Sequence, residues 1–332
     1  MSETSANGAE FVEEMLKRRR ALVSEEGRLD RMLEIRAVED RLQTLFNDGL
    51  VRGSTHLSNG QEAVAVGIAA SIRTTDWVAC TYRGHGTALA LGLTPGSVIG
   101  EIVGRTSGCV GGLGGSMHLS GPEVGLMPTF AIVGAGYPVA TGAALTAQVR
   151  GTDDVAVAIC GDGATNIGAF HESLNLASVW SLPVIFVIEN NLYGEYTRIQ
   201  LSTPIEDLAQ RADSYRMPNE IVDGQDVDSV MGAMDRSLQR ARSGQGPTLL
   251  EMKTYRYSGH SRSDKATYRP EGELDVWLKR DPILVYARQL GLTDTELEQR
   301  RQRIISTVDA ATEVALRSPE PPIGDLFAFV NA

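Results

Sequence analysis

The sequence has few cysteines and no long hydrophobic run, and both shortages exclude classes of protein. Its three cysteines are an odd number and contain no Cys-x-x-Cys pair, so neither a disulfide framework nor a zinc ribbon is supported. No apolar stretch approaches the ~20 residues that a membrane-spanning helix needs. We therefore expect a cytoplasmic protein that lives under reducing conditions.

Basic charge is also scarce. The 31 Lys and Arg residues stand against 42 Asp and Glu residues, which gives a formal net charge of −11. This balance argues against nucleic acid or an anionic membrane surface as the main partner. It leaves room for a local basic pocket that binds a phosphate group.

The first residues are polar and acidic, with Glu3, Glu10, Glu13 and Glu14 among them. A mitochondrial transit peptide would be poor in acidic residues, so this segment is not a targeting signal of that kind. We expect residues 1–29 to form a mobile N-terminal arm that ends in a helix.

Apolar runs alternate with helical patterns through the rest of the chain. Helical spacing is visible over residues 30–48, 61–71 and 169–179, and a small-residue helix follows the apolar segment 131–133. Continuous apolar runs occupy residues 155–160, 182–188 and 248–252, with a shorter strand pattern at 77–82. Runs that are apolar on both faces predict an α/β fold, a parallel sheet with helices on both faces. We expect one such domain over residues 30–332, ending in a charged helical extension.

Two polar motifs follow neighbouring strands of this predicted sheet. Gly161-Asp162-Gly163 ends one apolar run, and Asn190-Asn191 ends the next. Ligands of open parallel sheets bind beyond the carboxyl ends of the strands, so Asp162 and Asn191 should converge on one ion. A carboxylate, an amide oxygen and a backbone carbonyl suit Mg²⁺ and leave room for phosphate oxygens. Each motif alone would equally well be a surface turn.

The surrounding blocks resemble a known family. Gly161-Asp162-Gly163-Ala164-Thr165-Asn166 and Glu189-Asn190-Asn191-Leu192-Tyr193-Gly194 together resemble the thiamine diphosphate motif. More closely, the chain resembles the α subunits of the E1 component of 2-oxo-acid dehydrogenase complexes, from about residue 30 to 325. The resemblance includes His56-Leu57-Ser58-Asn59-Gly60-Gln61-Glu62-Ala63, Tyr82-Arg83-Gly84-His85-Gly86, Gly114-Gly115-Ser116-Met117-His118, Phe170-His171-Glu172-Ser173-Leu174-Asn175 and Tyr257-Ser258-Gly259-His260-Ser261. It implies the thiamine diphosphate-binding fold of the diphosphate (PP) type.

The resemblance also implies roles for individual residues. Mg²⁺ would be coordinated by Asp162, Asn191 and the carbonyl of Tyr193. Tyr82 and Arg83 would reach the diphosphate, where a guanidinium can donate two parallel hydrogen bonds. Backbone amides of Gly163 and Ala164 would bind the phosphates, and backbone groups of Ala131 and Val133 would hold the aminopyrimidine.

All five histidines fall within the blocks that carry the resemblance. We expect His260 to contact the cofactor and to transfer a proton or stabilise the reacting adduct. His56 is the second catalytic candidate, near the substrate. For His118 and His171 a structural role is favoured, and the role of His85 is left open.

The implied reaction is oxidative decarboxylation of a 2-oxo acid, with acyl transfer to a lipoyl domain of the E2 acyltransferase. Pyruvate is the first choice of substrate, and the alternative is an acetoin dehydrogenase α subunit. Thiamine enzymes need a glutamate on a separate pyrimidine-binding domain, and little length remains here for one. The resemblance therefore implies a partner β subunit in an α₂β₂ heterotetramer, without which the chain is inactive.

One departure from the family's usual pattern bears on the substrate. Glu195 and Tyr196 follow Tyr193-Gly194, where the family usually has Met or a small residue. A carboxylate directed inward would repel a substrate carboxylate and favour neutral acetoin. A carboxylate directed outward would be an ordinary solvated side chain.

Two other classes of protein remain as alternatives. An NAD-binding oxidoreductase would use the Gly134-Ala135-Gly136 turn, but the dinucleotide fingerprint needs Gly or Ala where Val139 stands. A non-catalytic protein of the same fold would be expected to lose its metal ligands, and Asp162 and Asn191 are both present.

Overall fold

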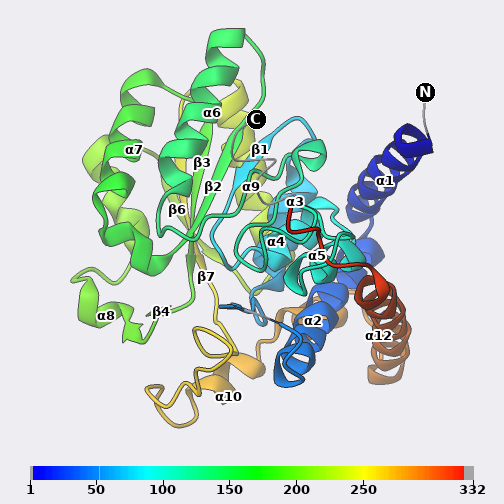
Figure 1. Cartoon of the computed structure of the whole chain (residues 1–332). Coiled ribbons are helices and arrows are strands. Elements are labelled where there is room, and N and C mark those ends of the chain that lie inside the picture. The colour runs from blue at the N-terminus through cyan, green and yellow to red at the C-terminus, as the bar shows by residue number, and fades with distance from the viewer. Residues whose placement is uncertain (1–2, 52, 325–332) are drawn as a thin grey trace.

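A parallel five-stranded sheet forms the centre of the computed structural model, which describes residues 3–51 and 53–324. The strand order is β1-β2-β3-β7-β6, and every neighbouring pair is parallel (Figure 1). The strands are β1 (Trp77–Ala79), β2 (Ala156–Gly161), β3 (Val184–Asn190), β6 (Asn219–Asp223) and β7 (Thr248–Lys253). The predicted α/β fold is confirmed, and β6 is the one strand of this sheet that the sequence patterns did not predict.

Alternate residues of the central strands enter two separate cores. Val157 and Ile159 of β2 pack in the core on one face, whereas Ala158 and Cys160 pack in the core on the other. Successive side chains of a strand point to opposite faces, so a strand buried on both sides is apolar at every position. This explains why the runs that predicted β2, β3 and β7 are continuous.

Helices cover both faces of the sheet, as expected. Figure 1 shows α6 (Gly136–Arg150) and α7 (Gly168–Trp180) on one face, and their residues share the second core with the strands. The opposite face is covered by α2 (Glu25–Asn47), α3 (Glu62–Ser71) and α9 (Val227–Arg242). Shorter helices are α4 (His85–Leu91), α5 (Pro95–Ile102) and α8 (Ile199–Ser202), with 3₁₀ helices at η1 (Ala21–Val23), η2 (Pro122–Val124), η3 (Asp162–Asn166) and η4 (Leu208–Tyr215).

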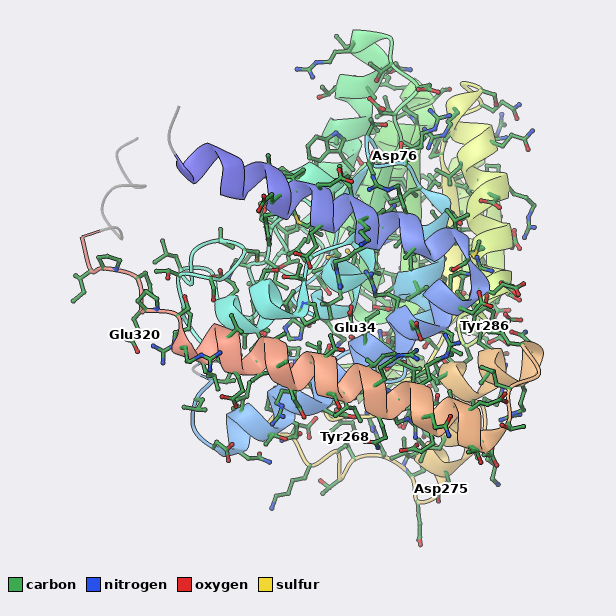
Figure 2. The ribbon with its side chains drawn as sticks, turned by 90° about the vertical axis from the view of Figure 1, so that its right-hand side faces the viewer. Glu34, Asp76, Tyr268, Asp275, Tyr286 and Glu320 are labelled. Atoms are coloured by element: carbon green, nitrogen blue, oxygen red, sulfur yellow. The ribbon has the colours of Figure 1, made fainter. Side chains whose placement is uncertain are left out.

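The N-terminal segment is helical and packed, which corrects the expectation of a mobile arm. Helix α1 covers Glu3–Arg20, and the boundary expected after residue 29 falls inside α2. Met15 is 2% exposed, and Arg18 of α1 forms an ion pair at 2.6 Å with Glu34 of α2, the residue labelled in Figure 2. Burial of apolar side chains together with this pair holds the segment on the domain.

The apolar residues 131–133 form no strand before α6. Ile132 is 74% exposed and Val133 is 45% exposed, in a bend that leads into the helix. A dinucleotide-binding fold needs a strand at this point, so the NAD alternative loses its structural basis.

The C-terminal extension is helical, as predicted. It contains α10 (Glu273–Leu278), α11 (Pro282–Gln289) and α12 (Asp294–Arg317). Helix α11 is capped by Asp281, whose carboxylate accepts hydrogen bonds from the amides of Ile283 and Leu284. None of the helices within residues 3–51 and 53–324 combines the length and apolar character needed to cross a membrane.

Candidate functional site

A cavity of about 540 Å³ lies at the carboxyl ends of β2 and β3. This is the edge where open parallel sheets bind ligands. Every residue to which the sequence assigned a site role lines the cavity: His56, Tyr82, Arg83, Ala131, Val133, Asp162, Gly163, Ala164, Asn191, Tyr193 and His260. The structure therefore brings the proposed metal, diphosphate and catalytic groups together in one place.

Asp162 and Asn191 meet as the strand order predicted. Asp162 begins η3 directly after β2, and Asn191 follows β3, the neighbouring strand. Asp162 is 1% exposed, and its Oδ2 atom has no hydrogen-bond partner among the described residues. A buried carboxylate oxygen without a partner is costly unless a cation or donor binds it. This oxygen is therefore positioned to coordinate a metal ion.

The electrostatics of Asp162 fit a metal ligand. Burial raises the pKa of its carboxyl to about 6, although the backbone amides of Gly163 and Asn191 act in the opposite direction. The side-chain nitrogen of Asn191 donates to Gln61 Oε1 at 3.3 Å, which turns its oxygen away from Gln61. An amide oxygen and a carboxylate oxygen are hard ligands that suit Mg²⁺.

A short hairpin closes over this loop. Its strands are β4 (Tyr193–Gly194) and β5 (Thr197–Arg198), and it begins two residues after Asn191. A Cβ atom added to Gly163 would lie 3.2 Å from the Cα of Gly194. The two glycines therefore allow the hairpin backbone, with Tyr193, to pack directly on the loop that carries Asp162.

The donor set fits Mg²⁺ and a diphosphate better than a transition metal. Within the described residues, no group of three or more His, Cys, Asp and Glu side chains is arranged to hold a metal. A hard cation would instead rely on Asp162, the Asn191 amide and a backbone oxygen, and would keep sites open for phosphate.

His56 and His260 come from distant parts of the chain and face each other in the cavity. Their ring centroids are 5.0 Å apart, and the Tyr82 ring lies 4.4 Å from that of His56. Burial, with a further contribution from Arg83, lowers the pKa of His56 to about 3 and that of His260 to about 4. Both imidazoles are therefore neutral at pH 7 and can each accept or donate a proton.

Two arginines supply the positive charge of the site. Arg83, 8% exposed, donates to the carbonyl oxygens of Leu57 at 2.6 Å and His260 at 3.0 Å. It thereby ties together the two loops that carry the histidines. Arg256 is 1% exposed, and its Nε atom has no partner among the described residues. A buried guanidinium with a free donor suits a phosphate oxygen.

Sequence reasoning missed Arg256 and Glu189, although both line the cavity. Arg256 stands immediately before the block that begins at Tyr257. This position next to a motif was the one sequence feature that could have identified Arg256 as a site residue. Glu189 is the penultimate residue of β3 and was quoted only as the neighbour of Asn190. Burial raises the pKa of its carboxyl to about 7, which marks it as a further titratable group of the site.

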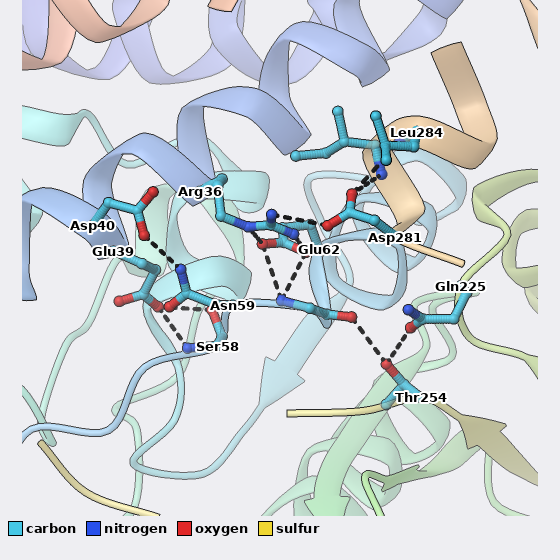
Figure 3. A network of polar contacts seen from close by, with 12 residues as sticks. Arg36, Glu39, Asp40, Ser58, Asn59, Glu62, Gln225, Thr254, Asp281 and Leu284 are labelled. Atoms are coloured by element: carbon cyan, nitrogen blue, oxygen red, sulfur yellow. Dashed lines mark hydrogen bonds and ion pairs between the residues drawn. The ribbon is translucent and has the colours of Figure 1, made fainter. Parts of the chain in front are cut away.

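A buried polar network holds the loop that carries His56 (Figure 3). The backbone amide and hydroxyl of Ser58 donate to Glu39 Oε1 at 2.9 and 2.7 Å. The amide of Gly60 donates to Glu62 at 3.0 Å, and Arg36 binds Glu62 at 2.9 Å. Arg36 also pairs with Asp281 at the start of α11. Helix α2 therefore fixes the loop through buried hydrogen bonds and ion pairs rather than apolar contacts alone.

The other three histidines serve the surrounding structure. His85 is fully buried between Glu39 Oε2 at 2.9 Å and Ser116 Oγ at 2.8 Å. His171 Nδ1 contacts the Tyr215 hydroxyl at 2.7 Å, and His118 Nδ1 lies 3.2 Å from the Gly114 carbonyl oxygen. None of these three lines the cavity.

Comparison with known proteins agrees with this geometry. The sequence profile of the family described as "Dehydrogenase E1 component" matches residues 30–323. The α subunit of an acetoin:2,6-dichlorophenolindophenol oxidoreductase from Bacillus subtilis is 39% identical over 95% of this chain and 97% of its own length. The α subunit of the pyruvate dehydrogenase E1 component from Rhizobium meliloti is 39% identical over 89% of this chain and 86% of its own. That from Zymomonas mobilis is 40% identical over 90% and 85%. The resemblance seen in the motifs is confirmed, and the chain belongs to the dehydrogenase E1 component family.

Proposed function

We propose that this chain is the α subunit of a thiamine diphosphate- and Mg²⁺-dependent E1 component that oxidatively decarboxylates pyruvate and passes the acyl group to the lipoyl domain of an E2 acyltransferase. The observation that carries the proposal is the partnerless, buried Oδ2 atom of Asp162, in a cavity with two buried arginines and two neutral histidines. The names of the relatives support both the reaction and the α-subunit assignment. The three free cysteines fit a cytoplasmic location.

When bound, thiamine diphosphate supplies the carbanion that adds to a carbonyl and then holds the electron pair. Asp162, Asn191 and the Tyr193 carbonyl would hold Mg²⁺, and Arg83 and Arg256 would bind phosphate oxygens. Backbone amides of Gly163 and Ala164 would add to this binding, while Ala131 and Val133 would hold the aminopyrimidine. His260 and His56 are placed to move a proton at the substrate oxygen, since both are neutral and adjacent.

A partner subunit is part of this proposal. Val133 lines the cavity and is 45% exposed, and its neighbour Ile132 is 74% exposed, so a second chain that covers these two residues would complete the cofactor site. We propose an α₂β₂ heterotetramer in which the β subunit provides the glutamate that contacts the aminopyrimidine. The relatives that are named as α subunits support the existence of such a partner.

Acetoin is the second candidate substrate, and a specific observation favours it. Glu195 lines the cavity, so a carboxylate is present where a substrate carboxylate would enter. Acetoin carries no charge and avoids this repulsion.

Co-expression with the partner subunit gene tests the function. The purified complex should reduce an artificial electron acceptor with pyruvate, and only when thiamine diphosphate and Mg²⁺ are present. The α chain alone should be inactive. Full activity of the α chain alone would refute the partner requirement, and thermal stabilisation by NAD but not by thiamine diphosphate would refute the cofactor assignment.

A further inference from the structure

The turn of the β4–β5 hairpin carries a backbone conformation that its sequence does not favour. Gly194 pairs with Thr197, so Glu195 and Tyr196 are the two turn residues. Glu195 has a φ of 55°, in the left-handed region. Two-residue hairpin turns that need a positive φ at the first position use Gly, Asn or Asp there. A glutamate at this position costs stability, and backbone outliers of this kind cluster at functional sites.

The turn is held in place from inside the site. Arg256, the buried arginine of the cavity, donates from Nη2 to the Glu195 carbonyl oxygen at 3.1 Å. The Tyr196 ring lies 6.2 Å from the His260 ring and 5.5 Å from that of Tyr268. The surroundings therefore impose the conformation of Glu195 and direct the turn toward the catalytic histidine.

The charge of Glu195 is not neutralised by its neighbours. No described residue forms a salt bridge with it, and Arg198, the cation of the same hairpin, is engaged by Glu273 at 2.8 Å. The Glu195 side chain is exposed and lines the cavity together with Tyr82. Burial raises the pKa of the Tyr82 hydroxyl, and the charge of Glu195 contributes in the same direction. A substrate that approaches His56 and His260 therefore meets an unpaired negative charge.

We propose that Glu195 is a specificity-determining residue that weakens the binding of carboxylate-bearing substrates relative to neutral 2-hydroxy ketones. This inference rests on the proposed function, because it concerns the substrate of the same site. Its physical basis is like-charge repulsion at the cavity mouth, while a neutral substrate can donate its hydroxyl hydrogen to the same carboxylate.

Three substitutions at one position separate charge from backbone conformation. Glu195→Gln removes the charge and keeps the size, Glu195→Asp keeps the charge, and Glu195→Gly removes the side chain and suits the positive φ. Glu313→Gln, an exposed substitution on α12, is the matched control for loss of one surface charge. All are made in the complete complex of both subunits.

The first readout is the ratio of kcat/KM for pyruvate to that for acetoin. We expect this ratio to rise about tenfold in Glu195→Gln and Glu195→Gly, as for one charge acting at roughly 5–10 Å through partly aqueous surroundings. It should stay close to the wild-type value in Glu195→Asp and Glu313→Gln. An unchanged ratio in Glu195→Gln, or an equal rise in Glu313→Gln, would overturn the proposal.

The second readout needs no turnover. Calorimetric titration of the loaded complex with methyl acetylphosphonate, a monoanionic analogue of a 2-oxo acid, should show about tenfold tighter binding in Glu195→Gln. Glu195→Gly should also raise the melting temperature, since the strained conformation is relieved. Unchanged affinity for the anion would refute the role of Glu195, whereas a wild-type complex inactive on both substrates would refute the proposed function and leave this titration valid.

Discussion

Replacing Asp162 by asparagine should make the cofactor-free protein more stable and abolish stabilisation by the cofactor. Burial raises the pKa of this carboxyl from 3.8 to about 6. One pKa unit corresponds to about 1.4 kcal/mol, so the ionised carboxylate costs the apo protein about 3 kcal/mol at pH 7. Asparagine avoids this cost but is a weaker acceptor for the backbone amides around it, by about 1 kcal/mol. We expect a net gain of about 2 kcal/mol.

The pH dependence gives the same prediction a second test. Because the folded-state pKa of Asp162 is raised, the destabilisation develops as pH rises from the unfolded value of 3.8 and is complete above about 6. The difference in unfolding free energy between Asp162→Asn and the wild type should therefore shrink as pH falls from 7 toward 4. Asp235→Asn, an exposed change on α9, should show no such dependence.

The assay is denaturation of the chain in EDTA and again with Mg²⁺ and thiamine diphosphate. At a ligand concentration of about 100 times Kd, the wild type should gain about 2.7 kcal/mol, and Asp162→Asn should gain nothing. A less stable apo variant would show that burial does not strain the carboxylate. A variant that the cofactor still stabilises fully would show that the carboxylate is not a metal ligand.

Three other substitutions test the supports of the site. Glu39→Ala leaves His85 without its buried partner and should lower the unfolding free energy by about 3 kcal/mol or more, measured by chemical denaturation. Arg36→Met leaves the carboxylate of Glu62 buried and uncompensated, and should lower the unfolding free energy by a similar amount. A second change, Glu62→Gln, should restore part of the lost stability, and no restoration would contradict the pairing. Arg256→Met should weaken binding of Mg²⁺–thiamine diphosphate at least tenfold in calorimetry, since a hydrogen bond to a charged group contributes about 1.5–3 kcal/mol. Unchanged affinity would exclude contact between Arg256 and the phosphates.

The parts of the fold that the sequence predicted are those whose pattern reflects burial on both faces. The runs that became β2 and β3 are apolar throughout and that of β7 is mostly apolar, because each strand lies between two cores. Strand β6 was missed because it lies at the sheet edge, where Ile221 is 48% exposed and only Ile221 and Val222 of its residues are apolar. A helix was expected within the N-terminal arm, but its packing on the domain was not, because a few apolar residues in an acidic segment are enough to anchor α1.

In the site, too, the sequence predicted residues that lie in short local motifs and missed residues whose role depends on distant parts of the chain. Residues within short motifs at strand ends were found, because the strand order alone brings Asp162 and Asn191 together. Arg256 was missed, since its suitability for binding a phosphate depends on burial beside a cavity that only the folded chain creates. The support of the His56 loop by Glu39 was equally inaccessible, because no sequence rule connects a charged residue of α2 with that loop.

The contact between Gly163 and Gly194 has a consequence for how fast the cofactor can load. Because the hairpin rests on the loop of Asp162, this glycine contact fixes the two segments that carry the proposed metal ligands relative to each other. Little ordering entropy then remains to be lost on binding. We expect Mg²⁺–thiamine diphosphate to associate in one rapid step, whereas Gly194→Ala, which separates the two segments, should introduce a slow phase in stopped-flow binding.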